Sequence, residues 1–189
     1  MAIQIAQDQH ADEVLSSSPF ALLAGMLLDQ QFPMERAFAG PAKVLDRFGT
    51  LDPAAIADAD PEAFAELCAT PPAIHRYGRS MAGRLQALAR VVVDEYDGDA
   101  SRIWSDAKTG EALLGRLKAL PGFGEQKAKI FTALLAKQLD VQPRGWTTVG
   151  GDYGKKGFRS VADVVDAESL AKVRAFKQEA KKAARASDV

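Results

Sequence analysis

The chain has 189 residues, enough to bury a sizeable core as one domain or as two small helical lobes. Its single cysteine, Cys68, excludes a disulfide within the chain and favours a reducing compartment. His10 and His75 lie far apart, so the sequence offers no zinc site. The apolar runs are too short and interrupted to cross a bilayer, and no signal-peptide pattern precedes them, so we expect a cytoplasmic protein.

The formal net charge of −1 hides an uneven distribution along the chain. Residues 1–114 carry 9 Lys+Arg and 17 Asp+Glu, a net of −8, whereas residues 115–189 carry 15 and 8, a net of +7. A basic half suggests that one face of the molecule meets a polyanion. A solvated basic helix at the C-terminus would account for part of the same count.

The first predicted helix follows a short stretch in which Ile3 and Ile5 suggest an extended piece. Ser18 is a suitable N-cap and Pro19 a suitable first helical residue. The helix is apolar nearly all round, so we expect it to be buried. Gln30 and Gln31 then lie at its exposed end, either as a polar C-cap or as functional groups.

A run of further helices is predicted after these glutamines. One extends from Pro33 to Phe48 and is closed by Gly49, and two short ones begin at the Asp-Pro pairs 52–53 and 60–61. An amphipathic helix runs from Ser80 to near Gly98. Thr109 caps the helix that leads to a hairpin, and Trp104 is assigned to the core in preference to a base-stacking role.

The stretch Leu117 to Phe131 has the narrowest physical interpretation. A helix ends at Pro121-Gly122, Gly124 follows, and a new helix begins at once. Both glycines can take positive φ and leave the backbone bare, so the amides at the new helix start can lie against an anion. Lys127 and Lys129 oppose the helix dipole but suit a site whose ligand carries negative charge. The alternative is an ordinary turn between helices, with Pro and Gly as breakers.

Beyond Leu139 the helical period is lost in a glycine-rich loop, residues 140–159. A last helix runs from Asp166 to about Arg185, with apolar residues on one side of its first half and Lys or Arg elsewhere. We expect it to pack by that first half, while its second half frays or meets phosphate.

The hairpin Leu-Pro-Gly-Phe-Gly-x-x-Lys-Ala, together with the buried helix that ends in two glutamines, resembles the helix-hairpin-helix (HhH-GPD) DNA glycosylase superfamily of base excision repair. The resemblance covers about residues 15–140. It implies an all-α fold of two helical lobes: one formed by residues 15–31 with the segment 141–189, and one by residues 33–140 with the hairpin at 120–124. The four cysteines of an iron-sulfur cluster are missing, so neither that cluster nor another cofactor is expected.

The resemblance also implies the DNA-contacting residues. The hairpin would bind the backbone, a glutamine at the place of Gln31 would fill the gap left by a rotated base, and the loop 73–80 would approach the opposite strand, where His75 and Tyr77 could stack on bases. A partly buried linker is the alternative for that loop. The full set of predicted DNA-binding residues is Gln30, Gln31, Arg76, Tyr77, Gly122, Phe123, Gly124, Gln126 and Lys127.

Two chemical roles remain in the family pattern. Strand-cutting members carry a lysine two residues after the second glycine, where this chain has Gln126; Lys127 is one place later, a rotation of about 100 degrees on a helix. Lys127 should therefore not inherit that role. The family aspartate would fall within 144–149, which contains no acid. We choose Asp152 as the catalytic carboxylate, with Asp140 and Asp29 as alternatives and a solvated turn as the other interpretation of Asp152.

These patterns predict a monomeric, nucleoid-associated protein that acts on double-stranded DNA, without a metal or a membrane. The leading function is a monofunctional DNA glycosylase. The alternatives are a catalytically inactive relative that binds DNA or recognises lesions, and a helical adaptor whose hairpin contacts protein. A carboxylate near the flipped base would separate the first two.

Overall fold

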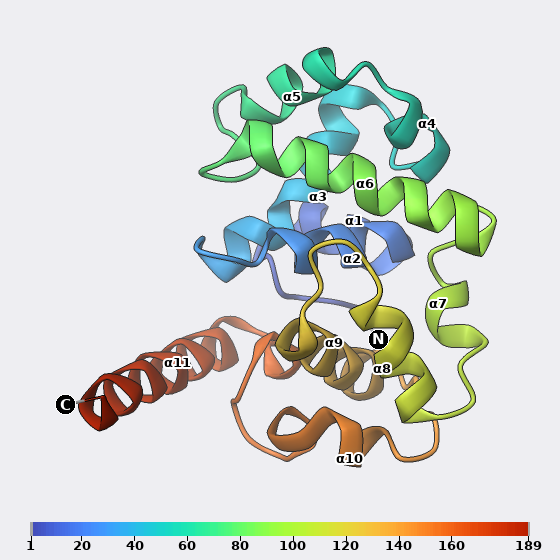
Figure 1. Cartoon of the computed structure of the whole chain (residues 1–189). Coiled ribbons are helices and arrows are strands. Elements are labelled where there is room, and N and C mark those ends of the chain that lie inside the picture. Colours follow the sequence, from blue (N-terminus) through green and yellow to red (C-terminus); the bar gives the residue numbers. More distant parts are fainter. Residues whose placement is uncertain (1, 189) are drawn as a thin grey trace.

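The computed structural model describes residues 2–188, and within that range the protein is built from eleven α-helices and two short 3-10 helices, with no strand (Figure 1). The all-α prediction is therefore confirmed. Contacts between helices divide them into a first lobe, α1–α6, and a second lobe, α7–α11, one above the other in Figure 1.

The first lobe is organised around α2, which is buried at nine of its ten positions. It packs mainly on α3 and also contacts α1 and α6, while α4 and α5 cover the other side of α6. The helices are α1 (Gln9–Ser17), α2 (Pro19–Leu28), α3 (Met34–Phe48), α4 (Pro53–Asp58), α5 (Pro61–Ala69) and α6 (Gly78–Tyr96).

The predicted helix starts in this lobe are confirmed at their caps. Ser18, Asp52 and Asp60 each accept a backbone N–H from three residues later, and a proline follows each of them. Gly49 closes α3 with φ of 90°. Helix α1, capped by Asp8, was not predicted.

The second lobe surrounds α9, most of whose residues are buried. Helices α8, α10 and both 3-10 helices contact it, and Trp104 of α7 is buried beside Phe131, with ring centroids 5.9 Å apart. The elements are α7 (Arg102–Ser105), α8 (Gly110–Lys118), α9 (Glu125–Gln138), α10 (Trp146–Gly150), η1 (Gly151–Gly154), η2 (Val161–Asp163) and α11 (Ala167–Ser187). The glycine-rich loop thus contains two short helices that its lack of period did not indicate.

This division differs from the predicted lobes, which grouped residues 15–31 with the C-terminal segment. Helix α2 has apolar residues on all sides, and α3, α1 and α6 pack against it within the N-terminal part of the chain. The C-terminal segment instead packs on α9 through η1, η2 and α10.

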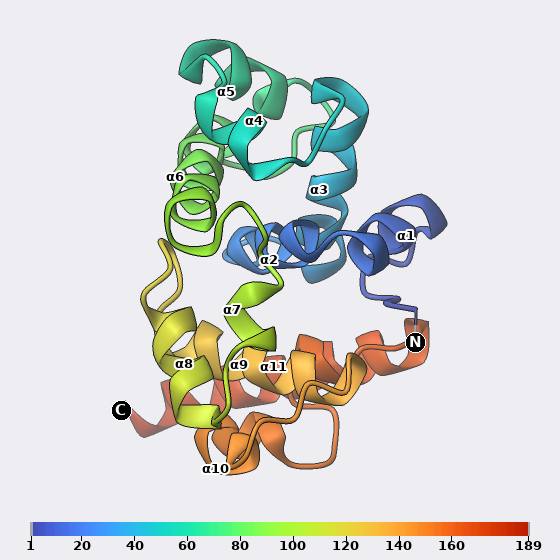
Figure 2. The same cartoon turned by 90° about the vertical axis from the view of Figure 1, so that its right-hand side faces the viewer.

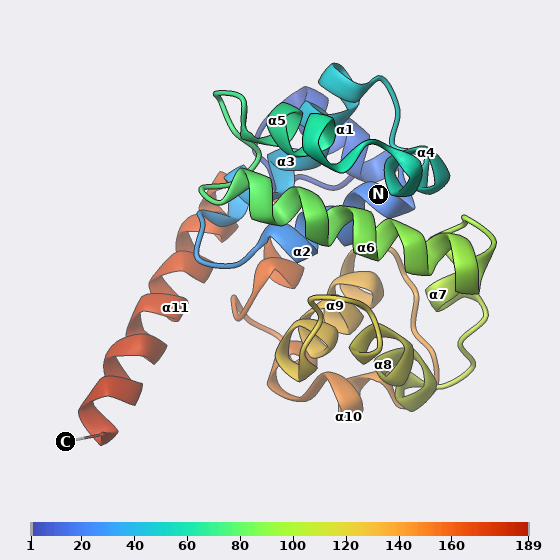
Figure 3. The ribbon, with the colours of Figure 1, turned by 45° about the horizontal axis from the view of Figure 1, so that its top comes forward.

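Helix α11 begins with a capping box between Asp166 and Ser169, as the sequence suggests at this start. Leu170 and Val173 are buried, but the helix then extends away from the rest of the molecule (Figures 1 and 3). Every residue from Gln178 to Asp188 is exposed. The helix carries six Lys or Arg against two Glu, so its free end is a positively charged arm.

The extended residues before α1 run along that helix and reach toward the second lobe (Figure 2). Ile3 and Ile5 are buried, so the expected extended piece belongs to the core. Among the described residues no single helix is long and apolar enough to cross a membrane; α1 and α2 meet the length and composition criteria only as a pair bent by 118°.

Candidate nucleic-acid interface

The turn between α8 and α9 is tight and bare. Phe123 N–H donates to Leu120 O at 3.1 Å, and Gly122 takes φ of +79°. Gly124 does not take the positive φ that the sequence allows. Its φ is −78°, so it is extended, and it serves as the N-cap of α9. The left-handed position required by the turn is Gly122 alone.

Phe123 does not face a ligand, contrary to the prediction. Its side chain is 4 % exposed and meets Phe131 edge-on, with ring centroids 6.1 Å apart. The phenyl ring anchors the hairpin to the second lobe and leaves its backbone outside. Phe123 therefore supports the hairpin from within, and its backbone is the part of this residue that faces outward.

The first turn of α9 offers free amide groups. The first intrahelical bond runs from Ala128 N to Gly124 O, so the amides of Glu125, Gln126 and Lys127 precede the hydrogen-bond ladder. A Cβ added to Gly124 would meet nothing within 4 Å, so the approach to these amides is open. Exposed N–H groups at the positive end of a helix are suited to an anion such as phosphate.

The hairpin lies directly on the end of α2. A Cβ at Gly122 would come within 2.3 Å of Leu27 Cδ1, so the leucine side chain would have to shift to admit it. The two motifs that sequence analysis identified, separated by some ninety residues, are therefore in contact. The positive φ favours glycine at position 122, and the absence of a side chain there lets the hairpin approach Leu27 closely.

Lys127 fastens the same contact. Its Nζ donates to Met26 O and to Leu27 O, both at 2.8 Å, and so satisfies carbonyls at the C-terminus of α2. Burial lowers the pKa of Lys127 to about 8, while nearby Asp29 opposes the shift. The prediction that Lys127 contacts DNA finds no support in this arrangement, because the amine faces protein carbonyls.

The glutamine loop combines a cap with an exposed side chain. Gln30 Nε2 donates to Leu27 O at 2.8 Å, and Arg84 Nη1 of α6 donates to Gln30 Oε1 at 3.1 Å. The side chain of Gln30 therefore binds a carbonyl in the last turn of α2, one residue beyond the C-cap Asp29. Gln31 takes φ of +52° and is exposed, free of this network. Its predicted role in DNA remains a prediction.

His75 is buried between the loop 73–80 and the loop that carries Gln30 and Gln31. The expectation that it stacks on bases is therefore wrong. It is 1 % exposed, and its ring lies 4.8 Å from that of Phe32. Its Nδ1 accepts the Tyr77 N–H at 3.0 Å, which leaves Nε2–H to donate to Gln30 O at 2.8 Å. Burial lowers the pKa of His75, and the neutral ring fits both bonds.

The exposed residues of the loop 73–80 remain available to a ligand. The Tyr77 side chain is 49 % exposed, and the Arg76 guanidinium lies 5.3 Å from the centre of its ring. An exposed aromatic ring beside a cation can stack on a base and neutralise a phosphate. Arg79 is instead ion-paired with Glu62.

Asp152 lies in an open environment. Its side chain is 70 % exposed and pairs with Lys155 Nζ at 2.6 Å. That hydrogen bond and the positive charge of Lys155 hold the pKa of Asp152 below its usual value. The next residue, Tyr153, accepts a hydrogen bond from Gln126 Nε2 at 3.0 Å, so the loop leans on the first turn of α9. This contact engages the predicted DNA-binding residue Gln126 with protein.

Asp29 has the opposite surroundings. It is the C-cap of α2, between Leu28 and the glutamines, and is half-buried. Burial raises the pKa of Asp29; the charges of Lys177 and Lys127 oppose the shift, and Glu35 adds to it. No described residue donates a hydrogen bond to its carboxylate or forms an ion pair with it. Asp140, exposed at the end of α9 with φ of +57°, has no comparable setting.

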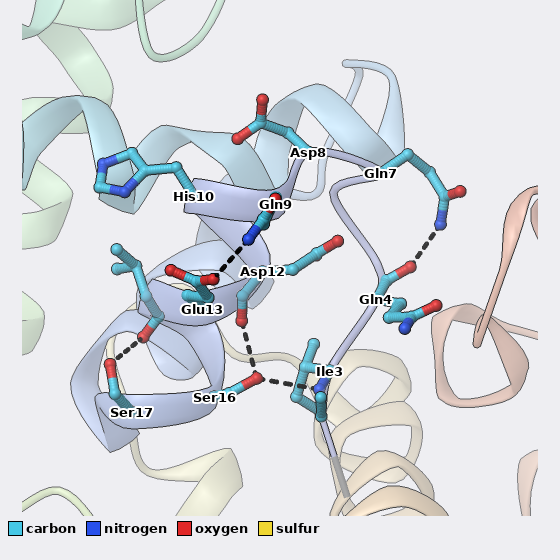
Figure 4. Close-up of a pocket in the computed structure, with 12 residues that line it drawn as sticks. Ile3, Gln4, Gln7, Asp8, Gln9, His10, Asp12, Glu13, Ser16 and Ser17 are labelled. Carbon is cyan, nitrogen blue, oxygen red and sulfur yellow. Dashed lines mark hydrogen bonds between the residues drawn. The ribbon is translucent and has the colours of Figure 1, made fainter.

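A separate groove of about 930 Å³ lies between the N-terminal segment and α1 (Figure 4). Its lining includes Asp8, Asp12 and Glu13, and internal hydrogen bonds such as Ile3 N–H to Ser16 Oγ close its base. Acidic side chains repel phosphate, so this lining does not suit a DNA backbone. Among residues 2–188 no cluster of three His, Cys, Asp or Glu side chains could hold a metal ion.

Comparison with family models identifies the class. The model described as HhH-GPD superfamily base excision DNA repair protein matches residues 24–188. This match covers most of the chain, so the protein belongs to the HhH-GPD superfamily and is a DNA-binding base excision repair protein of the glycosylase type. No curated protein and no solved structure matches the chain.

Proposed function

We propose that the protein is a monofunctional DNA glycosylase, which hydrolyses the N-glycosidic bond of a damaged base rotated out of double-stranded DNA. The observation that carries the proposal is the contact of Gly122 with Leu27. It places free helix amides, suited to one DNA strand, beside the loop that exposes Gln31. A strand held there has a polar side chain next to it that can enter the space of the rotated base.

The chemistry is a displacement at the sugar. The C1′–N bond breaks and its electron pair leaves with the base, while a water oxygen bonds to C1′ and loses a proton. Positive charge develops on the sugar, so a carboxylate beside it stabilises the transition state.

Two features of α9 support a glycosylase that does not cut the strand. Gln126 occupies the position of the family's nucleophilic lysine, and the Lys127 amine donates to the α2 carbonyls instead of facing outward. An amine held in this way would have to break two hydrogen bonds before it could attack a sugar carbon.

The test uses purified protein and a panel of duplexes, each with one damaged base. Base release, detected as an alkali-labile abasic site on at least one duplex, is the expected result. Borohydride should trap no covalent protein–DNA adduct. An adduct that disappears in Lys127→Met would contradict the monofunctional assignment.

A catalytically inactive DNA-binding relative is the second candidate, and the exposure and ion pairing of Asp152 favour it. Duplex binding without base release across the whole panel would support that candidate. The helical adaptor is less consistent with a bare hairpin flanked by a basic arm.

A further inference from the structure

The reaction needs a carboxylate close to the sugar, and three aspartates are available. Asp140 and Asp152 are exposed to solvent, and Asp152 is neutralised by Lys155. Only Asp29 lies between the hairpin contact and the glutamine loop, because it directly follows the turn of α2 on which Gly122 rests and precedes Gln30.

We propose that Asp29 is the catalytic carboxylate of this protein. The inference rests on the proposed glycosylase function. If the α9 amides hold the backbone and Gln31 enters the duplex, the sugar of the rotated nucleotide lies between them. The α2 C-cap is the acidic position in that interval.

The fold holds Asp29 as an unneutralised acid. Three elements bring charges toward it: Lys127 from α9, Lys177 from α11 and Glu35 from α3. None of them is within ion-pair distance of its carboxylate. Lys127 donates to Met26 O and Leu27 O, while Glu35 pairs with Arg174.

A half-buried carboxylate without a described partner is free to meet a ligand, and carboxylates with a shifted pKa concentrate at functional sites. Burial raises the pKa of Asp29, a direction that suits a group that accepts a proton. Asp29 stabilises the positive charge on the sugar and takes the proton that the attacking water loses when its oxygen bonds to C1′. The departing base carries the electrons of the broken bond and is protonated by solvent.

A binding experiment tests Asp29 without knowledge of the lesion. Two duplexes of one sequence are used, one with a neutral tetrahydrofuran abasic site and one with a pyrrolidine in its place, which is protonated and imitates the charged sugar. Wild type should bind the pyrrolidine duplex at least about tenfold more tightly, as expected for a transition-state mimic. Asp29→Asn should abolish that preference and leave affinity for the tetrahydrofuran duplex unchanged.

Asp152→Asn is the matched control and should keep the preference. A preference that persists in Asp29→Asn, one that disappears only in Asp152→Asn, or none in wild type overturns the role of Asp29. Failure to bind either duplex would instead contradict the proposed function. If Asp29→Asn does not fold, Asp29→Glu, which keeps the charge but displaces it by a methylene, should show a reduced preference.

Discussion

The junction of α2 with α9 and the glycine-rich loop after α9 each supply an aspartate, but they treat it differently. At the junction, Asp29 is half-buried, and the nearby amine of Lys127 is bonded to carbonyls of α2. In the loop, Asp152 is open to water and its own neighbour Lys155 neutralises it. The first environment raises the carboxyl pKa and the second lowers it.

The difference shows that sequence distance from the hairpin is a poor guide to the reactive acid. Asp152 lies closer to the family spacing, yet its contacts are those of a surface ion pair, which contributes little to stability or chemistry. Asp29 lies far from the hairpin in sequence and next to it in space. The surroundings of a group, more than its position in a motif, determine what it can do.

The largest expected effect is on the rate of base release. On any duplex from the panel that supports the reaction, Asp29→Asn should lower the single-turnover rate by roughly 100- to 1000-fold, the usual cost of removing one group that stabilises transition-state charge. Asp152→Asn should release base at the wild-type rate. The reverse result would move the catalytic role to the loop and cancel the contrast between the two regions.

The hydrogen bonds from Lys127 to the carbonyls at the end of α2, here called the Lys127 cap, should contribute strongly to stability. Lys127→Met removes two hydrogen bonds from a charged donor and leaves α2 carbonyls without it, so we expect a loss of about 2 kcal/mol in the free energy of unfolding, measured by chemical denaturation. Lys129→Met is the control, because Lys129 makes only a partly exposed pair with Glu125 at 3.4 Å. Equal stability of the two variants would show that the cap is dispensable.

The low pKa of Lys127 predicts a pH dependence with a definite sign. The unfolded chain binds this proton with the ordinary lysine pKa of 10.5, and the folded protein with a pKa of about 8. Between these values the unfolded state binds more protons, so the contribution of Lys127 to stability rises with pH. The test measures the free energy of unfolding of wild type and of Lys127→Met at several pH values. In the difference between the two proteins, the shared titrations of Lys43, Cys68 and Tyr96 cancel. A flat difference would contradict the buried amine.

Much of the fold could be predicted because its signals are local. Ser18, Asp52 and Asp60 cap the helices that follow them, and a proline marks each first turn. The start of α1 at Asp8 was missed, because its polar first turn shows little apolar period. In the site, the hairpin and the buried helix could be recognised from their residues. Their contact with each other could not be predicted.

What could not be predicted depends on distant contacts. The carbonyls that bind Lys127 lie about a hundred residues earlier in the chain. The one local signal was a lysine in the first turn of a helix, where the dipole disfavours it. That signal suggests a contact with an anionic ligand. In the structure the lysine instead binds the carbonyls at the negative C-terminal end of α2. His75 was misassigned for a similar reason, since its acceptor Gln30 O is supplied by a remote loop.

The hairpin amides give a prediction of intermediate size. Gly124→Val places a branched side chain in the open space before α9, so duplex affinity should fall about tenfold for every sequence, as for the loss of one good charge-assisted contact. The loss of the glycine N-cap should cost about 1 kcal/mol of stability. Gly115→Ala on α8, also with open space around it, is the control and should not change binding. Unchanged affinity in Gly124→Val would remove the amides from the interface.

The smallest effect concerns the arm formed by the exposed half of α11. Lys181, Lys182 and Arg185 extend beyond the packed part of the helix, where the acidic residues are Glu179 and Asp188. If they bind phosphates, replacing all three by Gln should weaken binding at low salt and reduce the slope of log affinity against log salt concentration by about 0.9 for each phosphate that is no longer neutralised. The hairpin would still hold the strand, so base release at saturating protein should not change.

An equal loss of charge elsewhere separates the arm's own binding from the effect of net charge. Replacing Arg90 of α6, Arg102 of α7 and Lys108 of the loop before α8 by Gln also removes three cations. Both arginines are ion-paired in the folded protein. If this control reduces the salt slope as much as the arm variant does, only the overall field matters and the arm is a solvated helix end. A reduced slope in the arm variant alone assigns α11 to flanking DNA. The junction of α2 and α9 would then position the reactive nucleotide, while the arm binds phosphates of the flanking duplex.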